Sequence, residues 1–317
     1  MDVFIDPLLF LQFIRTMTGG VFNQFFVTCS LYGEHLTLFI LISIIYWCFH
    51  KKLGEYLLLS MGWAGLVNGF AKLTACIYRP WIMDSRVHPV KEAIPGATGY
   101  SFPSGHTTNA TAFFGGLALK GNFSKALTAV LCLCIFLVGF SRNYLGVHSI
   151  LDVIFGFLFT LVLLIILKKL YDKLDEKPNL DLAIAAVGMI ASIILVVYAM
   201  TKSYPMDYDA AGKLIVDPAK LMLDSFDNAA ILFGFSVSWI IERRFIKFSV
   251  DGSLKDRVLR GLCGVIGLEL IMTVLIPIGK ANGMMGHFLT SFLMMVYIIV
   301  IVPLCVNYLH NRNPDST

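Results

Sequence analysis

The sequence predicts an all-α integral membrane protein with about nine transmembrane helices. Of its 317 residues, 57% are hydrophobic and only 15% are charged, a balance outside the usual range of soluble globular domains. Apolar stretches near the length that a transmembrane helix needs, about 20 residues, recur from residue 35 to the C-terminus. We expect helices over nine segments: His35 to Phe49, Leu53 to Tyr78, Ser104 to Leu119, Ala126 to Ser141, Ser149 to Leu167, Leu182 to Met200, Phe226 to Ile241, Gly261 to Gly279 and Met284 to Leu309.

The first 32 residues predict a helix that lies on the membrane surface. They lack the basic start and the small-residue cleavage site of a secretory signal. Polar residues at Asp6, Gln12 and Arg15 accompany apolar residues at helical spacing, which is typical of an amphipathic interfacial helix. The apolar residues are Phe4, Leu8, Leu9, Phe13 and Met17.

Cysteine usage and charge narrow the class of function. The seven cysteines fall almost all within apolar segments, without the spacing of a metal site or a disulfide framework, and we interpret them as small core residues. The net charge of +4 is spread through loops. No basic stripe interleaved with aromatic residues is present, so a nucleic-acid partner is not expected.

The distribution of Lys and Arg predicts the orientation in the membrane. If the nine segments alternate, one side holds fifteen of the 25 Lys and Arg residues and the other side holds ten. By the positive-inside rule the first side is cytoplasmic. Three polar blocks at the ends of four consecutive segments then face away from the cytoplasm.

The first block is the pair Lys72 and Arg79, followed by Pro80. Seven positions are two helical turns, so both cations share one face if the helix continues that far. Alone, the pair is also explained by side chains that reach lipid head groups from a helix end.

The second block is Pro103-Ser104-Gly105-His106. Proline and serine before an apolar run are typical of a helix start, where free backbone N–H groups favour an anion. Gly105 leaves room for an oxyanion to reach the backbone. An ordinary helix cap with an incidental histidine explains this block equally well on its own.

The third block places Ser141 and Arg142 before His148 and Asp152. Asp152 is one helical turn after His148, close enough to accept a hydrogen bond from the imidazole and fix its tautomer. A carboxylate that orients a histidine is typical of an activated base or nucleophile. A polar pair that only stabilises helix contacts is the alternative.

Together the three blocks favour a phosphate site. They bring three cations, two histidines and one carboxylate to one side of the membrane, where buried charge is costly without an anionic ligand. The cations and a helix start suit a phosphoryl group, and the histidines suit a nucleophile and an acid.

The blocks resemble the signature of the type 2 phosphatidic-acid phosphatase superfamily, which is K-x6-RP, then PSGH, then SR-x5-H-x3-D. Every position is matched over roughly residues 50 to 170. The resemblance implies a metal-independent phosphatase without a cofactor. We expect three regions: the interfacial segment at 1–32, a catalytic phosphatase core at 33–175, and additional C-terminal transmembrane helices at 176–317 packed on that core.

The resemblance also implies a role for each residue. His148 attacks phosphorus to give a phosphohistidine, Asp152 orients its ring, and His106 protonates the leaving oxygen. The phosphoryl oxygens are held by Lys72, Arg79, Ser104, Gly105 and Arg142. Water then hydrolyses the intermediate.

The substrate is left open at this stage. A site at the outer surface, here expected to be that of the plasma membrane, suits a phosphorylated lipid. Because the layout also resembles glucose-6-phosphatase, a water-soluble phosphate ester stays open. In the loop from Trp81 to Gly99, contacts to a head group are expected from Arg86, His88 and Lys91, although a solvated loop explains these three residues as well.

Three other functions fit parts of the pattern. A phosphotransferase of the same fold would use the same motifs, a vanadium haloperoxidase would hold vanadate in a similar pocket, and a lipid or phosphate transporter would use many helices. A transporter has no need of the pair His148 and Asp152. Glu269, inside an apolar segment, is expected to have a structural hydrogen-bond partner within the bundle, and His287 and Asn282 are expected at the membrane interface.

Overall fold

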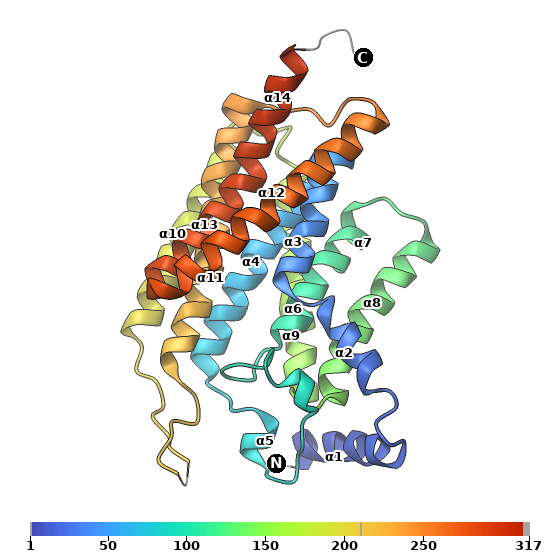
Figure 1. The fold of residues 1–317 in the computed structure, drawn as a ribbon, viewed down its shortest axis with the longest axis vertical. Helices are drawn as coiled ribbons and strands as arrows, with labels where there is room; N and C mark the ends of the chain where they lie inside the picture. The colour runs from blue at the N-terminus through green and yellow to red at the C-terminus, as the bar shows by residue number, and fades with distance from the viewer. Residues whose placement is uncertain (1, 210, 313–317) are drawn as a thin grey trace. The chain divides into compact units, whose positions relative to one another are not determined.

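The computed structural model describes residues 2–209 and 211–312, and its regular elements are helices (Figure 1). The α-helices are α1 Asp2–Met17, α2 Asn23–Leu31, α3 His35–Ile44, α4 Lys51–Ala75, α5 Pro80–Met83, α6 Gly105–Ala110, α7 Gly116–Lys120, α8 Lys125–Tyr144, α9 Ile150–Tyr171, α10 Leu180–Thr201, α11 Pro218–Ile241, α12 Leu254–Ala281, α13 Gly283–Val296 and α14 Val302–Arg312. The π-helical turns are η1 Ile45–Phe49, η3 Thr111–Gly115, η4 Glu242–Ile246 and η5 Tyr297–Ile301, and η2 Lys91–Ala93 is a 3₁₀ turn.

Five of these helices are long and apolar enough to cross a membrane, which makes the chain a multi-pass membrane protein. They are Lys125–Tyr144, Ile150–Tyr171, Leu180–Thr201, Leu254–Ala281 and Gly283–Tyr308. A sixth span arises if α2 and the α3–η1 helix, bent by 53° between them, count as one. The expected nine are therefore not confirmed, although all nine expected segments are helical over most of their length.

The remaining segments fall short for physical reasons. The run from Gly105 to Lys120 is 16 residues long, about 24 Å, whereas the hydrocarbon core is about 30 Å thick. Helix α4 has 25 residues, but Glu55 and Asn68 interrupt its apolar sequence. Helix α11 carries Asp224 and Asp227 in its first half.

The chain forms two compact units, which we describe separately. The first contains Met1–Leu38, Val67–Ile165 and Ala199–Met222. The second contains Phe39–Leu66, Ile166–Tyr198 and Leu223–Thr317. Residue 1 and residues 313–317, which belong to the expected terminal regions, lie outside the described residues.

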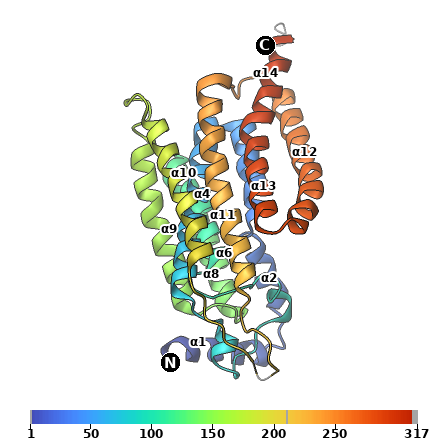
Figure 2. The same cartoon turned by 90° about the vertical axis from the view of Figure 1, so that its left-hand side faces the viewer.

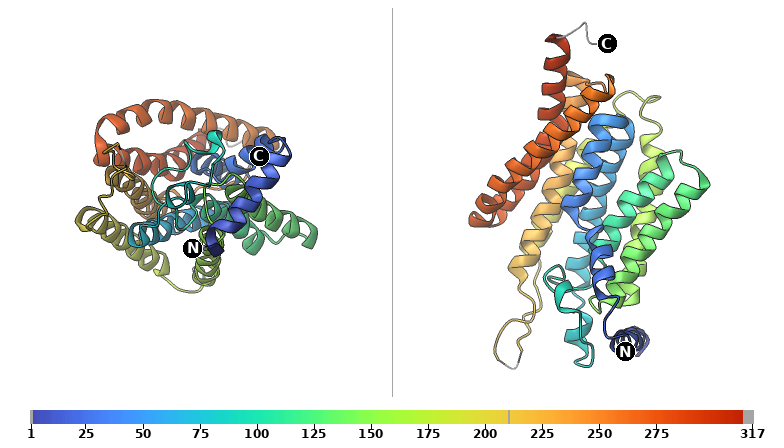
Figure 3. Two further views of the ribbon diagram at one scale, coloured as in Figure 1. Left: turned by 90° about the horizontal axis from the view of Figure 1, so that it is seen from below. Right: turned by 45° about the vertical axis from the view of Figure 1, so that its right-hand side comes forward.

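In the first unit, α6, η3 and α7 pack along α8, and α2 also packs against α8 (Figure 3, right). Phe26 of α2 contacts the rings of Phe140 and Tyr144, with centroids 5.5 and 4.2 Å apart. Buried residues of the loop before α6, such as Val90 and Ala93, join Tyr144 in one apolar cluster. This packing fixes the loop between α5 and α6 against the C-terminal end of α8.

Helix α1 lies across this loop in the same unit (Figure 1). Gln12 donates to the carbonyl of Arg86 at 3.0 Å and accepts from the backbone N–H of His88 at 2.7 Å. Arg15 donates to the carbonyl of Tyr144 at 2.8 Å and also to the carbonyl of His88. The helix is therefore attached to the protein by polar side chains.

The apolar residues of α1 divide into two sets. Ile5 and Leu8 are 2% exposed and pack into the protein. Phe10, Phe13 and Met17 are 62%, 59% and 71% exposed. Such exposed apolar side chains suit a membrane surface, but the interfacial position stays a prediction.

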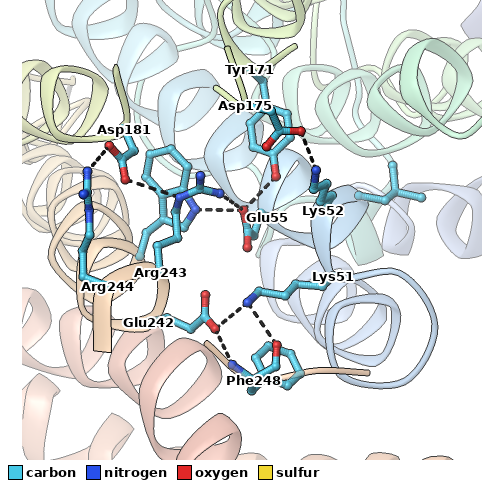
Figure 4. A network of polar contacts seen from close by, with 12 residues as sticks. Lys51, Lys52, Glu55, Tyr171, Asp175, Asp181, Glu242, Arg243, Arg244 and Phe248 are labelled. Atoms are coloured by element: carbon cyan, nitrogen blue, oxygen red, sulfur yellow. Dashed lines mark hydrogen bonds and ion pairs between the residues drawn. The ribbon is translucent and has the colours of Figure 1, made fainter. Parts of the chain in front are cut away.

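In the second unit, α12 and α13 form a hairpin that turns at Asn282 (Figure 2). Trp47 of η1 is fully buried and donates from Nε1 to the carbonyl of Ile298 at 2.8 Å. A network of charged side chains connects the helices of this unit (Figure 4). Its hub is Glu55 of α4, which accepts from the Tyr171 hydroxyl at 2.7 Å and from Trp239 Nε1 at 3.0 Å.

Candidate active site

The residues of the three sequence blocks meet in the first unit. Lys72 lies in the last turn of α4, and Arg142 in the last turn of α8. His106 is on α6, while His148 and Asp152 flank the start of α9. One compact unit thus contains the residues that the signature assigns to catalysis and to phosphate binding.

Lys72 and Arg79 do not share a helix face, because the helix does not continue as far as Arg79. Helix α4 ends at Ala75, and Cys76 has a left-handed backbone with φ of 47°. Arg79 is extended, with φ −66° and ψ 149°, because the ring of a following proline disfavours helical backbone in the residue before it. The interruption turns the Arg79 side chain into the protein, where it is 3% exposed.

Backbone carbonyls hold the Arg79 guanidinium in place. It donates to the carbonyl of Thr98 at 2.7 Å, to that of Val147 at 3.0 Å and to that of Gly99 at 3.2 Å. Lys72 Nζ donates to the carbonyl of Tyr100 at 3.3 Å. Neutral carbonyl oxygens thus orient both cations.

Ser104 caps α6 as expected. Its hydroxyl accepts from the backbone N–H of Thr107 at 3.4 Å and from the Thr107 hydroxyl at 2.9 Å, and its own N–H donates to the carbonyl of Asp152 at 2.9 Å. Beside Gly105 there is open space, since a Cβ there would meet only Asn68 Oδ1, at 4.0 Å. The backbone at Gly105 is therefore accessible to a ligand.

Arg142 is buried without a hydrogen-bonded counter-charge. Its side chain is among the largest fully buried ones, at 1% exposure, and its Nε and Nη2 have no hydrogen-bond partner. Burying a charged guanidinium whose N–H groups lack acceptors is costly in free energy. A phosphoryl group, which accepts two parallel N–H bonds from an arginine, would remove that cost.

His148 lies between Asp152 and Arg79. Its Nδ1 is 3.4 Å from Asp152 Oδ2 and 3.3 Å from the Ser101 hydroxyl. Its Nε2 is 2.8 Å from Arg79 Nη1. A proton on Nδ1 that faces Asp152 leaves the lone pair of Nε2 directed at the guanidinium.

The Asp152 carboxylate is itself fixed by two donors. Its Oδ2 accepts from the Ser101 hydroxyl at 2.6 Å and from the backbone N–H of Ser149 at 2.7 Å. Sequence reasoning missed Ser101, because a serine in a loop carries no pattern that separates it from any other. Its position two residues before Pro103 is the one available signal.

The imidazole of His148 is kept neutral. Burial lowers its pKa well below the usual value for histidine, and the positive charges of Arg79, Arg142 and Lys72 lower it further. A neutral ring has a free lone pair, as a nucleophile requires. His106 is partly exposed.

The loop residues expected to contact a head group have other contacts. Arg86 pairs with Asp84 at 2.7 Å and thereby lowers the pKa of that carboxyl. The backbones of Arg86 and His88 are bound by α1, and Lys91 is exposed on η2. Their contact with a substrate stays a prediction.

Two further expectations lie in the second unit. Glu269 is exposed on α12, so the expected partner inside the bundle is wrong. His287 pairs with Asp227 at 2.8 Å, and Asp227 also accepts from the Ser291 hydroxyl at 2.6 Å. Within the described ranges, no three His, Cys, Asp or Glu side chains are grouped as metal ligands.

The fold and the site define a class: helical membrane proteins in which buried cationic side chains surround a neutral histidine. Residues 54–176 match the model of the PAP2 superfamily. Residues 226–313 match the model of the transmembrane extension of PAP2 superfamily phosphatases. The chain belongs to the PAP2 superfamily.

Relatives with assigned names agree with this membership. Lipid phosphate phosphatase delta of Arabidopsis thaliana is 24% identical over 204 residues, 61% of this chain and 49% of the relative. Phosphatidylglycerophosphatase B of Bacillus subtilis is 31% identical over 136 residues, 40% and 64% of the two chains. Sphingosine-1-phosphate phosphatase 1 of Rattus norvegicus is 40% identical over 82 residues, 24% and 19%.

The similarity spans less than two thirds of each of these relatives. No solved structure matches the chain significantly.

Proposed function

We propose that the protein is a metal-independent membrane phosphatase that hydrolyses a phosphomonoester or pyrophosphate, most readily of a lipid, through a phosphohistidine. One observation carries the proposal. A neutral His148 has Nδ1 toward Asp152 and Nε2 toward Arg79, while Nε and Nη2 of the buried Arg142 have no hydrogen-bond partner. This arrangement combines an oriented nucleophile with guanidinium donors that suit a phosphoryl group.

The first half of the reaction transfers the phosphoryl group to the protein. His148 Nε2 attacks phosphorus as the bond from phosphorus to the alcohol oxygen breaks, and His106 gives its proton to that oxygen. Asp152 stabilises the positive charge that develops on the His148 ring. Arg79, Arg142 and Lys72 stabilise the charge on the phosphoryl oxygens.

The second half releases phosphate. His106, now neutral, accepts a proton from water as the water oxygen attacks phosphorus. The P–N bond breaks, and its electron pair returns to His148 Nε2. Inorganic phosphate leaves, and both histidines regain their starting protonation states.

The substrate class follows from the membrane and from the relatives. A site at a membrane surface is accessible to amphiphiles whose phosphate lies at the interface. Three named relatives are phosphatases of lipid phosphates, of phosphatidylglycerophosphate and of sphingosine 1-phosphate. We propose phosphatidate, phosphatidylglycerophosphate, polyprenyl pyrophosphates and sphingoid phosphates as the substrates to compare.

We further propose nine spans in the plasma membrane, with the site facing away from the cytoplasm and α1 lying at the interface. The bias of Lys and Arg supports the orientation. The exposed Phe10, Phe13 and Met17 support the interfacial helix. Reporter fusions in the turns after Lys120 and after Lys202 should report opposite sides of the membrane, and the same side for both would contradict the topology.

The test is phosphate release by the purified protein in detergent with EDTA, across those lipids and glucose 6-phosphate. We expect release that resists EDTA and disappears in His148→Ala. His287→Ala is the matched control, because it removes another histidine paired to an aspartate and should keep activity. No release from any substrate by folded protein would contradict the proposal and favour a phosphotransferase or a transporter.

A further inference from the structure

Four consecutive residues, 98–101, contact two cations of the candidate site and its carboxylate. The first two carbonyls of this segment accept from Arg79 at 2.7 and 3.2 Å, and the third accepts from Lys72 at 3.3 Å. The hydroxyl of its last residue donates to Asp152 at 2.6 Å. A shift of the 98–101 segment would therefore displace the two cations and the carboxylate together.

The stretch 77–79, which carries Arg79, is bound to this segment. The backbone N–H of Ser101 donates to the carbonyl of Ile77 at 2.7 Å. Helix α4 ends at Ala75, so the stretch lies beyond the hydrogen-bond ladder of that helix. Contacts with other segments must therefore fix the position of its backbone.

Tyr78, the residue directly before Arg79, makes such a contact. Its hydroxyl donates to Asp207 Oδ2 at 2.5 Å, across 129 positions of sequence. A hydrogen bond to a carboxylate is stronger than one between neutral groups. The ring of Tyr78 also lies 5.5 Å from the ring of Tyr100, between centroids. Tyr78 thus links Asp207 to both stretches.

The backbone around Asp207 is itself paired. The carbonyl of Asp207 accepts from the backbone N–H of Ile215 at 2.9 Å, and Tyr208 and Leu214 form an antiparallel bridge next to this bond. The Asp207 carboxylate is therefore presented to Tyr78 by ordered backbone on both sides of a turn.

The same part of the chain contacts the 98–101 segment a second time. Gly99 has a φ of 63°, and a Cβ on it would lie 2.5 Å from Leu221 Cδ2 near the start of α11. Leu221 is 1% exposed, and it belongs with Asp207 to the stretch Ala199–Met222 of the first unit. This stretch therefore contacts both backbone segments that place the Arg79 guanidinium.

We propose that Asp207 is a positioning residue for Arg79. Its bond to the Tyr78 hydroxyl holds the stretch 77–79 so that Arg79 Nη1 stays 2.8 Å from His148 Nε2 and can reach the phosphoryl group. The inference rests on the proposed function for the role of Arg79. Because a small displacement of a catalytic group lowers the rate strongly, loss of this bond lowers activity without unfolding the protein.

A double-mutant cycle tests this contact. Asp207→Ala and Tyr78→Phe each remove one partner, and we expect each to lower kcat/KM about fivefold, an effect typical of one hydrogen bond. The double variant should also lose about fivefold rather than about 25-fold, because both changes break the same bond. Asp207→Asn should stay within about twofold of the original value, since its amide oxygen still accepts from Tyr78.

Tyr208→Phe is the matched control. It removes another tyrosine hydroxyl from the paired backbone around Asp207, and Tyr208 is 57% exposed. We expect kcat/KM to stay within about twofold. Losses that multiply in the double variant, or equal losses in Asp207→Asn and Asp207→Ala, would overturn the inference.

Binding of inorganic phosphate separates this inference from a structural role and from the proposed function. Calorimetry in detergent measures it without turnover. We expect about fivefold weaker binding in Asp207→Ala, with nearly unchanged thermal stability because the bond is exposed.

The two proposals can fail independently in this experiment. Hydrolysis together with an unchanged phosphate affinity in Asp207→Ala would overturn the inference alone. Weaker phosphate binding in Asp207→Ala, without hydrolysis of any phosphate ester by the unchanged protein, would overturn the proposed function alone. No binding of phosphate by the unchanged protein would contradict both.

Discussion

The two units bury charged side chains in opposite ways. In the second unit, three cations face three carboxylates: Lys51 pairs with Glu242 at 2.6 Å, Arg244 with Asp181 at 2.6 Å, and Arg243 with both Glu55 and Asp181 at 3.4 Å (Figure 4). In the first unit, backbone carbonyls hold the guanidinium of Arg79, and the Nε and Nη2 atoms of Arg142 are buried without a hydrogen-bond partner.

The balance of buried charge distinguishes a structural charge network from a ligand site. Buried charges are tolerated when opposite charges and hydrogen bonds compensate them, as around Glu55. An excess of one sign is retained where a ligand supplies the other sign. We therefore expect the charge-balanced network around Glu55 to stabilise the fold and the cation-rich cluster around His148 to bind phosphate.

Changing Arg142 should produce the largest effect on activity. Arg142→Met keeps the volume and removes the buried charge, so we expect kcat/KM to fall about 100- to 1,000-fold, as when a donor to a transition-state oxyanion is lost. Thermal stability without ligand should not fall, because the lost guanidinium had unpartnered nitrogens. A large loss of stability would show that Arg142 is structural.

Changing Glu55 should produce the reverse result. Glu55→Leu leaves Arg243, the Tyr171 hydroxyl and Trp239 Nε1 without their shared acceptor. We expect a loss of about 3 kcal/mol in the free energy of unfolding, measured by chemical denaturation in detergent. The kcat/KM of the folded fraction should stay within about twofold of the original value. A loss of activity at unchanged stability would contradict a purely structural role for Glu55.

Ser101 should have a smaller effect that is confined to catalysis. Ser101→Ala removes the hydroxyl that donates to Asp152 and so weakens the orientation of Asp152 and His148. We expect the activation free energy to rise by about 1.4 kcal/mol, which lowers kcat about tenfold. Steady-state kinetics should show KM nearly unchanged. Ser291→Ala removes the equivalent donor to Asp227 in the second unit, and a similar loss of kcat there would argue against a specific role for Ser101.

The pH dependence of stability should also identify the site. The folded-state pKa of His148 is lowered, so the unfolded chain binds a proton below pH of about 6.5 that the folded chain does not. Stability is therefore present above that pH and falls as the pH decreases, by about 1 kcal/mol between pH 7 and pH 5.5. In His148→Gln this part of the loss should be absent, as denaturation at several pH values would reveal.

The sequence predicted which residues of the candidate site lie together better than it predicted the backbone that positions them. The spacings placed His148 next to Asp152 and Ser104 at a helix start, because a helical turn and a cap are local geometry. They did not reveal that α4 ends before Arg79, since the backbone there is set by Pro80 and by carbonyl contacts from the loop before α6. Ser101 reaches the site through a tertiary contact with Asp152, which leaves no spacing in the sequence.

The hydropathy pattern predicted the positions of the helices better than their packing. It located helices over all nine expected segments, because apolar runs determine helix position. Five of these helices have spanning length and apolarity by themselves, and the expected nine spans are not confirmed, since the run from Gly105 is short and α4 and α11 contain polar residues. It also did not reveal that Glu269 is exposed, because the packed face of α12 is set by its partners.

In the proposed mechanism, His148 carries the phosphoryl group as a phosphohistidine. The most direct measurement is to stop turnover of a ³²P-labelled lipid phosphate with alkaline detergent and to locate the label by peptide mapping. We predict an acid-labile, base-stable label on His148 that is absent from His148→Ala and present in His287→Ala. Hydrolysis without any label on His148, or a label on His106 instead, would contradict the account.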